Sequence, residues 1–128
     1  MKAVLAICVA LGLGACTQES STSSAPVATE PDVSLPAGMT RVSDPRLVCM
    51  VNDQHMDNPQ LPVEVDGKTY YGCCSSCVGK LHQLASARTA MDPVTGTSVD
   101  KATAVMIRDE AGRVRYFASE ETLRRYRQ

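Results

Sequence analysis

Apolar and polar side chains alternate between residues 61 and 72, and this alternation predicts two β-strands joined by a tight turn. The stretch reads LPVEVDGKTYYG, with Val63 and Val65 on one arm and Thr69 and Tyr71 on the other. The dipeptide Asp66-Gly67 between the arms is a strong signal for a two-residue turn. We therefore expect a β-hairpin over these twelve residues.

A helix is predicted directly after this hairpin. Ser75 or Ser76 can cap its N-terminus, because serine is a favoured N-cap residue. Apolar side chains then recur at helical spacing, at Cys77, Val78, Leu81 and Leu84. The pattern is that of a ββα unit.

The same order of elements recurs 45 positions later in the chain. An alternating stretch, a turn and a second alternating stretch occupy residues 104–108, 109–112 and 114–118. Ser119 can cap the following helix, whose first turn contains two glutamates that the helix dipole favours. A repeat of this kind indicates a duplicated ββα unit. Because neither unit alone buries much apolar surface, we expect residues 41–90 and 91–128 to pack together as one α+β domain.

Cysteines occur at the strand–helix junction of the first unit and not at that of the second. At the offset of 45, Cys73, Cys74 and Cys77 correspond to Ala118, Ser119 and Thr122. If these three residues build the same turn, the fold does not require sulfur there. The cysteines of the first unit then serve chemistry or cross-linking.

The first residues of the chain are predicted to be a signal peptide that takes no part in the fold. They read MKAVLAICVALGLGAC, with one basic residue and an apolar run that is too short to span a bilayer. Leu13-Gly14-Ala15-Cys16 resembles the lipobox of bacterial lipoproteins, which implies cleavage after residue 15 and lipidation of Cys16. The resemblance implies a lipid-anchored protein of the cell envelope. Thr17 after the cysteine favours the outer membrane, facing the periplasm.

Residues 16–40 are expected to form a lipidated N-terminus and a flexible tether. Serine, threonine, proline and alanine dominate this segment. Such a composition cannot bury enough apolar surface to offset the entropy of ordering the chain.

Charge and composition give no sign of a nucleic-acid partner. They also favour a binding protein over an enzyme. The 13 basic and 14 acidic residues give a net charge of −1, and no basic stripe is evident. The sequence offers no Ser/His/Asp set, no paired carboxylates and no phosphate-binding loop.

Three cysteines are spaced as C-x23-C-x3-C, at Cys49, Cys73 and Cys77. The last two lie near the predicted start of a helix, where a thiol loses its proton more readily, and thiolates are the ligands of soft metals. VCMVNDQHM at residues 48–56 and VDGKTYYGCCSSC at residues 65–77 resemble the TRASH and YHS group of small heavy-metal-binding domains. MDPVTGTSVDK at residues 91–101 resembles the opening motif of the same group, with Asp92 in place of its cysteine. The resemblance implies that these three cysteines are metal ligands.

The residues leave the metal open between copper(I) and zinc. A closed zinc site needs four nitrogen or sulfur ligands, and His55 could complete the set. Copper(I) accepts three thiolates, or two with a thioether from Met50 or Met56, and these two methionines favour copper. Cys74 could join either set. The expected function is capture or delivery of the ion in the periplasm, with a metal donor or acceptor protein as partner.

Two other interpretations of the cysteines stay open. A small exported domain with four cysteines commonly forms disulfides, which would make this a stapled interaction domain without metal. Cys74-Ser75-Ser76-Cys77 is also a C-x-x-C at a helix start, the arrangement of thiol oxidoreductases, although the chain is short for that fold.

Overall fold

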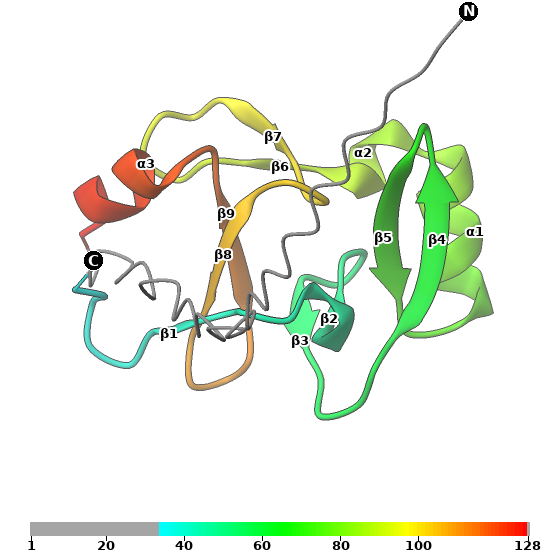
Figure 1. Ribbon diagram of the computed structural model, residues 1–128, viewed down its shortest axis with the longest axis horizontal. Coiled ribbons are helices and arrows are strands. Elements are labelled where there is room, and N and C mark those ends of the chain that lie inside the picture. Colours follow the sequence, from blue (N-terminus) through cyan, green and yellow to red (C-terminus); the bar gives the residue numbers. More distant parts are fainter. Residues whose placement is uncertain (1–33, 128) are drawn as a thin grey trace, which may run out of the picture. The chain divides into compact units, whose positions relative to one another are not determined.

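The computed structural model describes residues 34–127, which form an α+β fold of small antiparallel sheets and short helices (Figure 1). The strands are β1 (Thr40–Arg41), β2 (Val48–Cys49), β3 (Gln54–His55), β4 (Leu61–Val65), β5 (Lys68–Gly72), β6 (Thr89–Met91), β7 (Ser98–Asp100), β8 (Val105–Arg108) and β9 (Val114–Phe117). The helices are α1 (Ser75–Gln83), α2 (Ala85–Arg88) and α3 (Glu120–Arg125), and a 3-10 turn, η1, covers Pro45–Leu47. The predicted signal peptide, Cys16 and most of the predicted tether lie outside the described residues. Within them, no helix is both long and apolar enough to cross a membrane.

The predicted hairpin is confirmed as β4–β5. Asp66 and Gly67 form its two-residue turn with φ of 52° and 74°, the left-handed conformation that Asp-Gly adopts readily. The turn pairs Val63 with Tyr70, so Tyr70 shares the buried face with Val63. Tyr71, the next residue along β5, is half-buried and packs against the hydrophobic cluster that contains Val63 and Tyr70.

Helix α1 begins one residue earlier than Ser75 as N-cap would place it, and two residues earlier than Ser76 would. Cys74 is the N-cap, and its side chain makes no capping hydrogen bond. Cys77 and Leu81 are buried on the face toward the hairpin, whereas Leu84 follows the helix as its C-cap and is 49% exposed. The helix is thus held by packing of its apolar side and not by its cap.

A second hairpin, β8–β9, precedes α3. Ser119 caps α3 as predicted: its hydroxyl accepts a hydrogen bond from Thr122 N, and the Thr122 hydroxyl accepts one from Ser119 N. Strand β1 pairs with β8 to complete a three-stranded sheet in the order β1-β8-β9. Hairpins β2–β3 and β6–β7 precede β4–β5 and β8–β9 along the chain, and the sequence pattern did not reveal either of them.

One hydrophobic core connects the two halves of the described fold. Val63, Tyr70 and Leu81 from the first hairpin and helix share a cluster with Met106 and other side chains of β8 and β9. A smaller cluster of Ile107, Phe117 and Leu123 lies under α3. Because both hairpin–helix pieces contribute side chains to the main core, both are needed to bury its apolar surface.

Candidate metal centre

Three thiols from separate elements converge at one end of hairpin β4–β5. Cys49 ends β2, Cys73 follows β5, and Cys77 lies in the first turn of α1. The Sγ atoms of Cys73 and Cys77 are 3.6 Å apart, and those of Cys49 and Cys77 are 3.9 Å apart. All three lie within 4.8 Å of one another. The three cysteines that the spacing singled out therefore form one cluster of free thiols.

These separations match those of sulfur ligands around one metal ion. With metal–sulfur bonds of about 2.3 Å, two sulfurs are about 3.8 Å apart in a tetrahedral site and about 4.0 Å apart in a trigonal one. The two distances from Cys77 need little adjustment to reach either geometry, and the third, within 4.8 Å, lies in the same range. The cluster can hold a metal ion.

Gly72 allows the helix to bring Cys77 to the strand. A Cβ atom built on this buried glycine would lie 3.0 Å from Cys77 Cβ and 3.2 Å from the Cys77 carbonyl carbon. Such contacts are closer than packed carbon atoms tolerate. The close approach of β5 and α1 thus depends on the missing side chain, a role that sequence reasoning missed.

We expect Gly72→Ala to weaken metal binding without unfolding the domain. The added methyl group pushes Cys77 and the first turn of α1 away by a few tenths of an ångström, which spreads the thiols. We expect the affinity for Cu(I) to fall about tenfold, because substitution of residues that position metal ligands typically lowers metal affinity by about this factor. Competition with a chromophoric chelator measures it, with Gly79→Ala as control because a Cβ at Gly79 meets nothing within 4 Å. Equal affinities in the two variants would refute this role of Gly72.

The surroundings of the thiols favour ionisation at Cys49 and oppose it at Cys73. Burial of Cys49 opposes the thiolate, but the backbone N–H groups of Asn52 and Cys73 favour it, and its pKa is lowered. The pKa of Cys73 is raised to about 12, first by its side-chain hydrogen bond to Cys49 and then by the one to Cys77. Burial raises the pKa of Cys77 as well. A positive ion at the centre of the cluster is what would allow all three thiols to lose their protons together.

Cys74 lies beside the cluster but outside the group of three. Its Sγ atom is 3.6 Å from Cys77 Sγ, and the side chain is exposed. Its pKa is lowered, chiefly because the backbone N–H of Cys77 favours the thiolate. Cys74, the possible further ligand of the sequence analysis, thus contacts Cys77 but does not belong to the group of three.

The other candidate ligands are placed differently. Among residues 34–127, the group of side chains that can hold a metal ion does not include His55, which pairs with Val48 between β3 and β2. Met50 is fully buried in the main hydrophobic core. Met56 is half-buried, and its backbone N–H donates to Leu47. Ordinary packing thus accounts for Met50, the methionine nearest Cys49 in the sequence.

A buried lysine from the other half of the fold secures the turn that follows Cys49. The Lys101 ammonium donates to the Met50 carbonyl and to Asp53 Oδ1, both at 2.6 Å. The Lys101 side chain is only 5% exposed. Asp53 has a left-handed backbone with φ of 54°, and its carbonyl accepts a hydrogen bond from Val114 N at 2.8 Å. The half without cysteines therefore shapes the loop whose amides face Cys49. The sequence around Lys101 does not predict that its side chain is buried, so this contact could not be foreseen.

Asp92 occupies in the second half a place similar to that of Cys49 in the first. Its carboxylate is fully buried and accepts hydrogen bonds from the backbone of Val94 at 2.8 Å, Thr95 at 3.3 Å and Ala118 at 2.8 Å. Val94 and Thr95 lie two and three positions after Asp92, as Val51 and Asn52 do after Cys49. Those two amides, with the amide of Cys73, are the ones that favour the Cys49 thiolate. In the second half, the Asp92 carboxylate thus joins the loop at Val94 to the strand–helix junction at Ala118. In the first half, thiols occupy the corresponding region.

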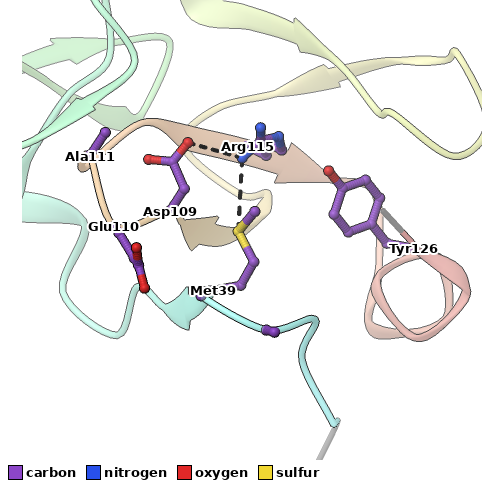
Figure 2. A pocket seen from close by; sticks show the side chains of 8 residues that line it. Met39, Asp109, Glu110, Ala111, Arg115 and Tyr126 are labelled. Atoms are coloured by element: carbon purple, nitrogen blue, oxygen red, sulfur yellow. Dashed lines mark hydrogen bonds and ion pairs between the residues drawn. The ribbon is translucent and has the colours of Figure 1, made fainter.

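A separate surface depression lies away from the thiols, between the approach to β1 and the β8–β9 turn (Figure 2). The Arg115 guanidinium donates to Asp109 Oδ2 at 3.5 Å and lies 3.8 Å from Met39 Sδ. Its charge is therefore neutralised within the depression, whose lining includes none of the cysteines.

No family model, curated protein or solved structure matches this chain.

Proposed function

We propose that the protein binds one soft metal ion through Cys49, Cys73 and Cys77, and that it captures or delivers copper(I). The observation that carries this proposal is the convergence of three thiols, from β2, from the residue after β5 and from α1, within 4.8 Å of one another. Two of them are buried, at 0% and 6% exposure, in a domain whose other half builds a similar junction without sulfur. The resemblance to TRASH and YHS domains supports the same ligands.

The ligand set favours copper(I) over zinc. Copper(I) is satisfied by three soft thiolates, whereas structural zinc is bound by four nitrogen or sulfur ligands. His55, the proposed fourth zinc ligand, does not join the group among the described residues. Zinc binding would need Cys74 or a ligand from a partner.

We also propose that residues 41–90 and 91–128 are tandem ββα units, the second of which has exchanged its metal ligands for a hydrogen-bonded carboxylate. The parallel between Asp92 and Cys49 supports this. The N-caps Cys74 and Ser119, separated by 45 residues, support it as well. On this proposal, Asp92, Ala118 and Thr122 stand where the first unit has its three metal ligands.

Grafting cysteines onto the second unit tests the duplication. We expect the combined variant Asp92→Cys, Ala118→Cys and Thr122→Cys to bind a second equivalent of Cu(I), because the backbone there resembles that of the first unit. Native mass spectrometry counts the ions per chain. The single variant Asp92→Cys serves as control and should still bind one ion. A triple variant that folds, as judged by circular dichroism, and yet binds only one ion would contradict the duplication.

The tether and location form the last part of the proposal. Residues 1–15 would be removed, lipid on Cys16 would anchor the chain, and the domain would face the periplasm of a bacterial cell envelope. Each buried methylene of a lipid chain contributes about 0.8 kcal/mol to membrane binding, so two or more chains anchor a protein stably. Fractionation tests this: Cys16→Ser should release the protein from washed membranes, and continued retention would refute the anchor.

Metal loading of the reduced protein tests the function itself. We expect native mass spectrometry under anaerobic conditions to show one Cu(I) per chain, retained in the presence of a weak competing chelator. A protein that takes up no metal and recovers as an oxidised, disulfide-linked species would instead favour the stapled interaction domain. Turnover of a disulfide substrate by metal-free protein would favour thiol redox chemistry.

A further inference from the structure

Two other thiols, those of Cys73 and Cys74, lie equally close to the thiol of Cys77. Of these two, only Cys73 belongs to the proposed metal site. Cys77 Sγ lies 3.6 Å from Cys73 Sγ and 3.6 Å from Cys74 Sγ. Cys74 remains outside the group of three that lie within 4.8 Å of one another. An ion bound to Cys77 can therefore reach Cys74 without leaving Cys77.

The four thiols differ in their access to solvent. Cys49 and Cys77 are buried, whereas Cys73 and Cys74 are exposed. The centre is thus closed on the side of Cys49 and open on the side of Cys73 and Cys74. Any exchange of an ion with another molecule has to take place on the open side.

The local structure gives an independent sign that the sulfur of Cys74 is used. Cys74 is the N-cap of α1, a position where serine is among the most favourable residues. The N-cap of α3 is Ser119, whose hydroxyl accepts from Thr122 N, but Cys74 makes no such capping bond. The helix start therefore lacks a cap that a single oxygen would provide, and a thiol stands there beside the central ligand.

We propose that Cys74 is the exchange ligand of the centre, through which copper(I) passes to or from a partner that presents soft sulfur ligands. This inference rests on the proposed function. The Cu–S bond to Cys49 breaks as the Cu–S bond to Cys74 forms, and the proton released by Cys74 is taken up by Cys49. On the open side, a thiol of the partner then takes the place of Cys73: the Cu–S bond to Cys73 breaks as the Cu–S bond to the partner forms, and the proton of the partner thiol passes to Cys73. Cys77 holds the ion throughout the first step, so the ion is never released as free copper.

Cys74→Ser isolates this role because serine is the residue found at the equivalent cap. The full chain is loaded with one Cu(I) under anaerobic conditions, and transfer to excess bicinchoninate is followed by its colour in a stopped-flow instrument. We expect transfer from Cys74→Ser to be at least about tenfold slower than from the wild type. The reason is that the loss of one ligand in the exchange step raises the activation barrier of that step. The equilibrium affinity should change by less than about threefold, since the resting ligands are intact.

Two controls separate this outcome from other effects. Ser75→Ala alters the same helix start without removing a thiol and should transfer copper at the wild-type rate. Thermal melts of metal-free Cys74→Ser should show stability equal to or above that of the wild type, because a cap is gained. A slower transfer can then not be assigned to a damaged fold.

The possible results distinguish this inference from the proposed function. If wild-type protein binds copper and Cys74→Ser releases it equally fast, the exchange role is wrong and the metal site stands. If Cys74→Ser loses affinity as severely as Cys73→Ser, Cys74 is a ligand of the resting site and the exchange role is again wrong. Failure of the wild type to bind copper would overturn the proposed function and this inference with it.

Discussion

Replacement of Cys77 by threonine will weaken copper(I) binding by at least about a hundredfold while leaving the domain folded. Cys77 is the central thiol, 3.6 Å from Cys73 and 3.9 Å from Cys49. Structural zinc sites gain about 10–16 kcal/mol from four ligands, so the loss of one ligand should lower affinity by at least about a hundredfold. Competition with a chromophoric copper(I) chelator measures the change.

Threonine is the appropriate replacement because Thr122, 45 positions after Cys77, occupies the first turn of α3 and is compatible with a helix there. Circular dichroism should therefore show native secondary structure for Cys77→Thr. Ser76→Ala, at the exposed neighbouring position, is the control and should bind as the wild type does. Near-wild-type affinity in Cys77→Thr would mean that the ion binds elsewhere.

Removal of the Asp92 carboxylate will strongly destabilise the domain. Asp92→Ala leaves three backbone N–H groups, of Val94, Thr95 and Ala118, without their acceptor. The three bonds are partly buried, and each hydrogen bond to a charged group contributes about 1.5–3 kcal/mol, so we expect a loss of at least about 3 kcal/mol. Urea unfolding of metal-free protein measures it. A loss below about 1 kcal/mol would show that the carboxylate does not hold the loop to the strand–helix junction.

The Asp92 carboxylate will also make the free energy of unfolding depend on pH in the acidic range. Burial of Asp92 opposes its charged form, but the backbone N–H groups of Ala118 and Val94 outweigh this effect and lower the pKa. The folded state therefore binds the proton more weakly than the unfolded chain does. The stabilisation is present above the unfolded value of about 3.9 and is lost as the pH falls through the lowered folded pKa.

Asp92→Asn isolates this contribution from those of the other acidic groups, because asparagine keeps one acceptor oxygen and does not titrate. We expect the difference in free energy of unfolding between wild type and Asp92→Asn to be constant near neutral pH. It should shrink below about pH 4. A difference that stays the same down to the acid limit of folding would contradict the lowered pKa.

Local signals of the sequence predicted the elements that local physics determines. Asp66-Gly67 fixed the first hairpin, because few dipeptides adopt a left-handed turn as readily. Ser119 marked the start of α3, since a hydroxyl before an apolar helix meets the free N–H groups there. The grouping of Cys49, Cys73 and Cys77 was also foreseeable, although their spacing alone could not give the distances.

Features that depend on tertiary contacts were not foreseeable. The two-residue strand β3 is too short for alternation to reveal it, so its pairing with the apolar stretch that contains β2 was not foreseen. The choice of Cys74 over Ser75 as N-cap follows from the length of β5, which ends at Gly72 against α1. Tertiary packing of the helix outweighs the preference for a capping oxygen.

The contribution of the second half to the thiol centre depends on contacts that are distant in sequence. Lys101 reaches back 51 positions to the carbonyl of Met50 and 48 positions to Asp53. These bonds fix the turn whose amides favour the thiolate of Cys49. A half without cysteines can thus be retained because it preorganises the half that has them.

X-ray absorption at the copper edge of the Cu(I)-loaded, full-length protein tests the central claim most directly. The account predicts a first shell of three sulfur atoms at about 2.3 Å, with no nitrogen or oxygen, because three thiols already lie at separations compatible with such bonds. A first shell of nitrogen or oxygen atoms, or protein that retains no copper for the measurement, would contradict it.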